Sequence, residues 1–233
     1  MSSTTAMAHI VGEMRATLRE TVQATTYGPL IWALTLLPPL ALMIGVAVQP
    51  WVDPGDLLRD PLAVAETVDR CCKVYHGAVS SLGVLLWAAS AAVCLFAAAV
   101  LYTLARPMAE VVFMASAGLL TGLFTVDDLF LVHDNILPAF GVAQPVTYAA
   151  YGLCGITYLL LSWRQILKCR YGLLAVAIAL LAISVVVDSL FHSDHPARIL
   201  IEDGAKIGGI FAWASFHATA AWQLLVRSSG AER

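Results

Sequence analysis

The chain has 233 residues, of which 60% are hydrophobic and 12% are charged, with a formal net charge of -3 and a mean hydropathy of +0.80. Soluble globular proteins contain about 45–50% apolar and about 25% charged residues, so this composition excludes a soluble enzyme and leaves no room for a sizeable soluble domain. The small net charge and the lack of a basic stripe also exclude a nucleic-acid-binding protein.

The chain begins with an amphipathic segment, residues 1–28. Charged residues separate apolar residues that recur at helical spacing, which is typical of a helix lying at the cytoplasmic interface of a membrane. The apolar face consists of Met7, Ile10, Val11, Met14, Leu18 and Val22. A frayed tail is the alternative interpretation. Because the segment has no small-residue cleavage site, we interpret the first apolar stretch as a retained span and not as a signal peptide.

Six later segments are long and apolar enough to cross the roughly 30 Å of hydrocarbon, which needs about 20 helical residues. They are predicted at Leu30–Val48, Ala78–Tyr102, Val111–Val132, Pro145–Trp163, Tyr171–Phe191 and Ile199–Val226. The predicted fold is therefore all-α: a polytopic bundle of six transmembrane helices (residues 29–227) that follows the amphipathic N-terminal helix and ends in a cytoplasmic tail, residues 228–233.

The one long loop between predicted spans covers residues 49–77. The sequence WVDPGDLLRDP (residues 51–61) is typical of turns, whereas LAVAETVDRCCKVYHG (residues 62–77) has helical propensity, so we expect a short surface helix there. Cys71 and Cys72 are adjacent, a spacing that rarely closes a disulfide. Two plain thiols are favoured over an intermolecular bridge or a thiol ligand, and these alternatives stay open.

The distribution of lysine and arginine near the span ends predicts the orientation. Cytoplasmic loops carry an excess of these residues. One side of the predicted bundle carries Arg15, Arg19, Arg106, Arg164, Lys168, Arg170, Arg227 and Arg233. Both termini are therefore predicted to be cytoplasmic, in a bacterial inner membrane, and loop 49–77 is predicted to be external.

Small residues recur every four positions in two of the spans. Gly118 and Gly122 form a GxxxG pattern in the third span, and Gly204, Gly208 and Ala212 continue the pattern in the sixth. Small residues allow helices to approach closely in lipid. We therefore expect the third and sixth spans to pack together and to bring their ionisable ends together.

The main functional signal is a set of ionisable residues at the predicted outer ends of three spans. A charge at the centre of a membrane helix costs about 2.5–3.5 kcal/mol on insertion scales, so such groups usually face the bundle interior and mark function. The set contains Asp127 and Asp128 inside the third span and His133 and Asp134 at its outer edge, Asp188, His192 and His195 around the end of the fifth, and Glu202, Asp203 and Lys206 in the sixth. The spacing of Lys206 from the two acidic residues predicts an intrahelical ion pair.

Carboxylates and imidazoles from three helix ends are the ligands that zinc or another divalent metal ion uses. The predicted ligands are Asp128, His133, Asp188 and His192. Glu202 and Asp203 are the predicted catalytic acids or bases, and Lys206 is their electrostatic partner. Further candidates are Asp127, Asp134, His195 and His217. Because a metal-bound water attacks esters and amides, the leading hypothesis is a metal-dependent hydrolase acting on a lipid or lipophilic substrate.

Two other functions stay open. In the first, the carboxylates bind a cation or a proton in a transporter or channel. The inward polar path then has only Thr121, Thr125, His217 and a few serines. In the second, the charges pair across helices and fix the packing of a membrane scaffold. The expected partners are membrane lipid and either a lipophilic substrate or a cation, and formation of a homo-oligomer is left open.

Two sequence strings resemble known signatures. DDLFLVHD (residues 127–134) and IEDGAKIGGIFAW (residues 201–213) resemble strings in uncharacterised bacterial multipass membrane proteins. This resemblance implies a prokaryotic inner-membrane protein with a shared site at these residues, and it implies no activity. A fainter similarity is to the CREST hydrolases, such as alkaline ceramidases and adiponectin receptors, whose zinc is held by three histidines near a serine and an aspartate. Because the last span here has only His217 and no HxxxH pair, that similarity implies a type of mechanism alone.

Overall fold

The structure, a computed structural model, describes residues 28–62, 64, 73–190 and 196–230. Within these ranges the regular elements are helices and no strand is present. The predicted amphipathic helix lies outside the described residues except for Gly28. Cys71, Cys72, His192 and His195 lie outside them as well.

Long helices account for most of the described chain. They are helix Gly28–Val48, α4 (Ala78–Thr103), α5 (Met108–Phe130), α7 (Gln144–Ile166), α8 (Tyr171–Leu190) and α9 (Pro196–Gly230). Shorter elements are α2 (Pro54–Leu58), the π-helix η1 (Val132–Ile136) and α6 (Leu137–Ala139). Five of the long helices, all but α9, are long and apolar enough to cross a membrane. This confirms the predicted class, an all-α multipass membrane protein. α9 coincides with the sixth predicted span, and polar residues such as Glu202, Lys206 and His217 lower its hydropathy.

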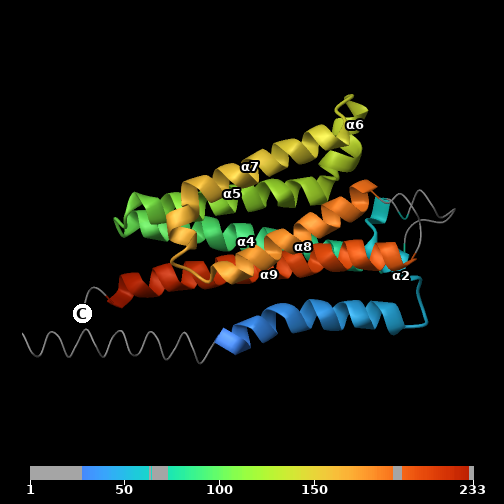
Figure 1. Ribbon diagram of the computed structural model, residues 1–233, viewed down its shortest axis with the longest axis horizontal. Coiled ribbons are helices and arrows are strands. Elements are labelled where there is room, and N and C mark those ends of the chain that lie inside the picture. The colour runs from blue at the N-terminus through green and yellow to red at the C-terminus, as the bar shows by residue number, and fades with distance from the viewer. Residues whose placement is uncertain (1–27, 63, 65–72, 191–195, 231–233) are drawn as a thin grey trace, which may run out of the picture.

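The long helices run antiparallel to their neighbours in the chain and form an elongated bundle (Figure 1). α4 packs against both α5 and α9, α7 packs against α5, and α8 packs against α9. Helix Gly28–Val48 lies along α8 and α9, where Trp32 approaches Gly172 and Met43 approaches Gly204. The start of helix Gly28–Val48 and the end of α9 lie at the same end of the bundle. We call the opposite end, where α5 and α8 end and α7 and α9 begin, the cluster end.

Burial separates an interior from an outward apolar surface. The core contains large side chains that are at most 1% exposed, among them Leu101, Phe113, Leu173, Ile210 and Phe216. Large apolar side chains also remain exposed on the long helices, for example Leu34, Leu85, Leu119, Leu160 and Val186. An apolar surface of this extent is unfavourable in water at about 25 cal/mol per Å². These side chains are therefore suited to contact lipid tails.

The small residues of α5 and α9 do not pack against one another. Gly118 lies against Leu95 of α4, whereas Gly204 lies against Met43 and Gly208 lies against Leu180 of α8. The expectation that these residues form the interface between the third and sixth spans is thus corrected. The GxxxG pattern marks where a helix can be approached closely, and it does not specify which helix approaches. α5 and α9 meet instead through aromatic side chains, such as Phe113 and Phe216, and through the charged pair of Asp128 and Lys206.

The segment predicted as turns, residues 51–61, contains α2. Asp53 caps this short helix by accepting a hydrogen bond from Gly55 N at 2.8 Å, and Pro54 fits its first turn. Leu58 is 1% exposed and packs in a small apolar cluster with Val46, Val79, Ile199 and Ile207. α2 therefore covers the cluster end beside α4 and α9.

Gly118→Ala is expected to destabilise the fold by about 1–3 kcal/mol, because overpacking a close helix contact forces backbone shifts. The added Cβ would lie 2.7 Å from Leu95 Cγ and 3.1 Å from Leu95 N. Thermal unfolding of the detergent-purified protein measures the loss. Gly122→Ala is the matched control, one helical turn further along α5, where nothing lies within 4 Å of an added Cβ. Equal losses in both variants would contradict the packing of α5 on α4.

Candidate functional site

An ion pair joins α5 to α9 at the cluster end, with the Lys206 side chain 33% exposed and the Asp128 side chain 12% exposed. Lys206 Nζ lies 3.0 Å from Asp128 Oδ1, and Trp87 Nε1 of α4 donates to Asp128 Oδ2 at 3.0 Å. Both carboxylate oxygens therefore have a donor, as a charge removed from water requires. The predicted intrahelical pair of Lys206 with Glu202 or Asp203 is corrected, because the ammonium reaches across to the end of α5.

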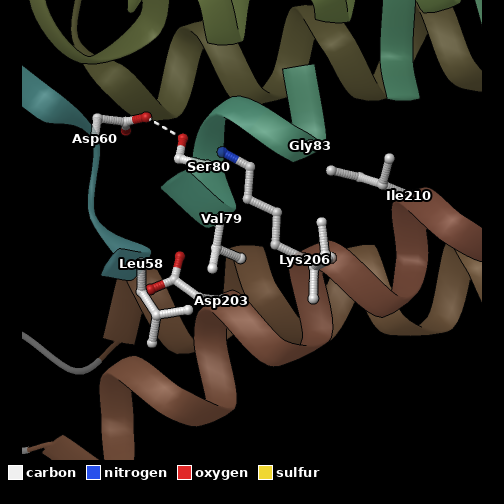
Figure 2. Close-up of a pocket in the computed structure, with 9 residues that line it drawn as sticks. Leu58, Asp60, Val79, Ser80, Gly83, Asp203, Lys206 and Ile210 are labelled. Atoms are coloured by element: carbon white, nitrogen blue, oxygen red, sulfur yellow. Dashed lines mark hydrogen bonds between the residues drawn. The ribbon is translucent and has the colours of Figure 1, made fainter. Parts of the chain in front are cut away.

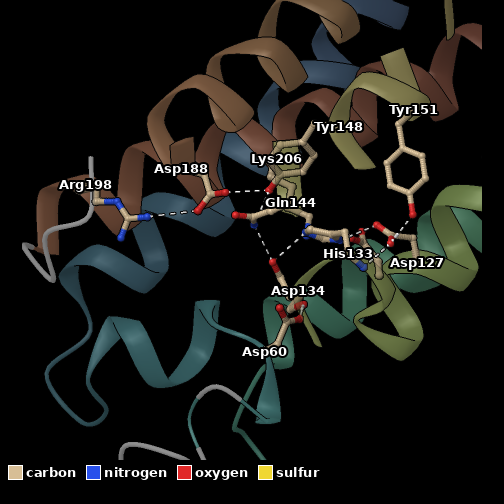
Figure 3. Close-up of polar contacts among 12 residues, drawn as sticks. Asp60, Asp127, His133, Asp134, Gln144, Tyr148, Tyr151, Asp188, Arg198 and Lys206 are labelled. Atoms are coloured by element: carbon tan, nitrogen blue, oxygen red, sulfur yellow. Dashed lines mark hydrogen bonds and ion pairs between the residues drawn. The ribbon is translucent and has the colours of Figure 1, made fainter. Parts of the chain in front are cut away.

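His133 lies between two carboxylates (Figure 3). Its Nδ1 is 2.6 Å from Asp127 Oδ2, and its Nε2 is 3.2 Å from Asp134 Oδ1. An ionised carboxylate only accepts hydrogen bonds, so both ring nitrogens donate only when the imidazole is protonated. Burial disfavours that charged form, but the hydrogen bond to Asp127 and the charges of Asp134 and Asp127 outweigh it. The pKa of His133 is therefore raised above its ordinary value.

A sharp backbone turn after α5 brings these groups together. Leu131 has φ 51°, a left-handed conformation that is uncommon for residues other than glycine, and η1 follows it directly. Asp127 Oδ1 then accepts a hydrogen bond from His133 N at 2.9 Å. In a straight helix Asp127 and Asp134 share a face that excludes His133. The turn instead brings Asp127 and Asp134 into contact with the same His133 ring. π-Helical turns are frequent at functional sites.

Asp127 is the most enclosed acid of this group. It is 6% exposed, and Tyr151 OH of α7 donates to its Oδ1 at 2.7 Å. Asp127 is therefore not a solvated surface group. With donors from His133 and from Tyr151, its carboxylate ties the end of α5 to α7.

A chain of hydrogen bonds continues from Asp134 to α8 (Figure 3). Gln144 Nε2 lies 3.0 Å from Asp134 Oδ1 and also 3.0 Å from Tyr148 OH. Tyr148 OH donates to Asp188 Oδ2 at 2.8 Å. The contacts among His133, Asp134 and these residues thus link η1, α7 and α8 by polar groups at one end of the bundle.

Arg198 extends the same chain to α9. Its guanidinium lies 3.4 Å from Asp188 Oδ1 and 2.9 Å from Glu202 Oε2, one helical turn along α9. Glu202, a predicted general acid or base, is therefore paired with a permanent cation. Asp203, its neighbour in sequence, instead lines a cavity together with Lys206 (Figure 2).

The cavity has a volume of about 30 Å³ and lies between α9, α4 and the segment that follows α2. Its polar lining is Asp60, Ser80, Asp203 and Lys206, and its apolar lining includes Leu58, Val79 and Ile210 (Figure 2). The Ser80 hydroxyl donates to Asp60 Oδ1. A volume of this size accommodates about one or two water-sized species.

The predicted metal ligands do not converge among the described residues. Asp128, His133 and Asp188 each bond to different partners, and His192 lies outside the described ranges together with His195. Within those ranges no three His, Cys, Asp or Glu side chains form a group able to hold a metal ion. Zinc or another divalent ion therefore stays a prediction.

His217 lies deep in the core and away from the cluster end. It is 0% exposed; Nδ1 lies 2.9 Å from Trp213 O, and Nε2 lies 2.9 Å from Tyr158 OH. Since a carbonyl oxygen cannot donate, Nδ1 carries the hydrogen and Nε2 accepts from Tyr158. Both nitrogens are satisfied in the neutral ring, as in a hydrogen-bonded core histidine.

Several residues of the network were not predicted from the sequence. They are Asp60, Ser80, Trp87, Gln144, Tyr148 and Tyr151. One signal was available: Gln144, Tyr148 and Tyr151 recur at i, i+4 and i+7, which puts three hydrogen-bonding groups on one face at the start of a span.

The fold and this site define a multipass membrane protein with linked ionisable side chains at one end of its helix bundle. A family model for a domain of unknown function (DUF8692) matches residues 30–220, and the chain belongs to this family. No curated protein and no solved structure matches the chain. The family match includes both sequence strings noted above, and no match connects the chain to the CREST hydrolases.

A double-mutant cycle on Lys206 and Asp128 is expected to give a coupling energy of about 0.5–3 kcal/mol. Lys206→Met leaves Asp128 without its cation, and Asp128→Asn leaves the ammonium without its anion. The double variant should therefore lose less stability than the two single losses combined. Thermal and denaturant unfolding in detergent measure the coupling. A matched cycle on Lys206 and Glu202 should show weaker coupling, because Glu202 pairs with Arg198. Stronger coupling to Glu202 would contradict this assignment.

The stabilising effect of His133 is expected to decrease as pH rises. Its pKa is raised in the folded protein, so its contribution is complete below the ordinary histidine pKa of about 6.5 and is lost as pH rises through the folded-state value. His133→Gln should therefore lower the free energy of unfolding more at about pH 5.5 than at about pH 9. The control is Tyr148→Phe, which removes a neutral donor and should cost a similar amount at both pH values. A His133→Gln deficit that grows with pH would overturn the assignment.

Proposed function

We propose that the protein is a proton-conducting membrane transporter whose proton site is His133. The observation that carries the proposal is the placement of both His133 ring nitrogens on carboxylate oxygens, at 2.6 and 3.2 Å. Loss of the proton turns one nitrogen into an acceptor that faces a second acceptor, which is unfavourable. The contacts of Asp127 and Asp134 with His133 therefore depend on one proton.

Loss or gain of that proton would affect contacts between several helices. Asp127 bonds to Tyr151 of α7, while Asp134 connects through Gln144 and Tyr148 to Asp188 of α8. A local charge change shifts a conformational equilibrium when the two states differ in the contacts it makes. A network that joins η1, α7 and α8 meets this requirement, because its contacts lie between elements and not within one helix.

Polar groups inside the bundle support the transport part of the proposal. Trp213 Nε1 donates to Thr121 Oγ1 at 2.9 Å, and Tyr158 OH bonds to His217 one turn further along α9. The hydroxyls of Ser116 and Ser162 lie 3.4 Å apart on α5 and α7. These pairs supply hydrogen-bonding groups between facing helices, where the sequence offered only isolated residues.

The two other functions have less support in the described geometry. A metal-dependent hydrolase needs convergent ligands, whereas Asp128, His133 and Asp188 have separate partners. A scaffold needs only permanent pairs such as Lys206 with Asp128. A scaffold gives no reason for a titratable imidazole between two carboxylates.

Proton flux into liposomes that contain the purified protein tests the proposal. With an internal pH-sensitive dye and a potassium–valinomycin clamp, the protein should carry protons faster than liposomes without protein. His133→Gln should reduce the flux to that background, because glutamine binds no proton. His76→Gln is the matched control: His76 is buried in the segment that precedes α4, and its carboxylate partner Asp56 is 3.9 Å away. Flux that is equal in wild type and His133→Gln, or no flux with wild type under gradients of either direction, would overturn the proposal.

A further inference from the structure

One face of α7 changes from apolar to basic where this helix reaches the end of the bundle opposite the cluster end. Leu160, Trp163, Arg164 and Leu167 follow one another at positions i, i+3, i+4 and i+7, which places them on one side of the helix. Leu160, Trp163 and Leu167 are each more than half exposed. Arg164 is exposed as well, and so is Lys168, which follows directly. No described element of the chain therefore covers this face.

The two basic side chains of this face have no carboxylate partner within the described ranges. The Arg164 guanidinium lies over the Trp163 ring, 5.3 Å from its centroid, and a contact with a ring face leaves the in-plane N–H donors available. Lys168 forms no ion pair. Among the described residues of this end of the bundle, the acidic residue is Glu110, and Arg106 already pairs with it at 3.2 Å. Two permanent positive charges thus remain without a counter-charge from the described chain.

The order of these groups along α7 matches the order of groups along a phospholipid. Acyl chains contact apolar side chains such as Leu160, whereas an indole such as that of Trp163 is typical of the headgroup level. A phosphate accepts hydrogen bonds from a guanidinium and is attracted by an ammonium, the groups of Arg164 and Lys168. The segment from Leu160 to Lys168 contains no acidic residue that would bind the ammonium of a zwitterionic headgroup. The charges of this face therefore favour an anionic lipid.

We propose that Arg164 and Lys168 bind the phosphate of an anionic phospholipid of the phosphatidylglycerol class, whose acyl chains lie along the exposed face of α7. α7 ends at the opposite end of the bundle from α6 and the proton site (Figure 1). The lipid surface therefore shares no residue with the site at His133. The inference goes beyond the proposed function and does not depend on it.

Native mass spectrometry of the detergent-purified full chain tests the inference. The protein is titrated with phosphatidylglycerol or with phosphatidylcholine of the same acyl chains, and the apparent Kd of the first bound lipid is measured. Wild type should bind phosphatidylglycerol at least about tenfold more tightly, because two unpaired cations act on one anionic headgroup. The variant Arg164→Gln/Lys168→Gln should lose this preference. The matched control is Arg106→Gln/Glu110→Gln, which removes a cation of the same end together with its partner.

The outcomes separate this inference from the proton proposal. Loss of the preference in Arg164→Gln/Lys168→Gln, with the preference kept in the control, supports the lipid site. Equal wild-type affinities for the two lipids, or an unchanged preference in Arg164→Gln/Lys168→Gln, overturn it, whatever the proton flux. A wild type that binds inorganic phosphate but does not prefer phosphatidylglycerol would assign the two cations to a soluble anion and also overturn it. If the double variant unfolds, Lys168→Gln replaces it, and an unchanged preference in that variant overturns the inference.

Discussion

The ion pair between Lys206 and Asp128 is the interaction on which the arrangement of the cluster end depends. The Asp128 side chain is 12% exposed, and an uncompensated charge in low-dielectric surroundings costs several kcal/mol. Lys206 enters from α9, Asp128 from α5, and Trp87 of α4 supplies the remaining donor. Three helices are thus joined at one point by a charged pair and a hydrogen bond. The small-residue contacts of Gly118 with α4 and of Gly208 with α8 then set how closely α5 packs on α4 and α9 packs on α8.

The contacts around His133 differ from this pair in a way that matters for function. Lys206, Asp128 and Trp87 form a set in which each carboxylate oxygen has a donor that keeps its proton. The set of Asp127, His133 and Asp134 is complete only while the imidazole is protonated. One end of the bundle therefore combines a permanent contact between helices with a contact that depends on pH. The permanent pair can preserve the packing of α5 on α9 while the other contacts change.

The sequence predicted the helices well because hydrocarbon thickness and hydropathy fix their length directly. It did not predict which residues the ionisable side chains contact. The spacing rule for helix pairs placed Lys206 beside Glu202, although the actual partner, Asp128, is 78 residues away in the chain. The contact of Asp127 with His133 also requires a left-handed backbone at Leu131. No sequence signal indicates this conformation, because position 131 is neither glycine nor asparagine. Hydrogen bonds from Tyr148 and Tyr151 were missed because aromatic residues near span ends are usually interpreted as interfacial anchors.

The exposed fractions of the three side chains in the proton site indicate from which side a proton enters. The Asp134 side chain is 40% exposed, that of His133 is 13% exposed, and that of Asp127 is 8% exposed. In the proposed function, a proton from water therefore meets Asp134 first and is held at His133, while Asp127 remains enclosed behind it with its donor from Tyr151. Release to the same water restores the first state, and release elsewhere requires that α5 and α7 separate near Asp127. Coupling to transport thus rests on the contact between Asp127 and Tyr151, because it closes the inner side of the site.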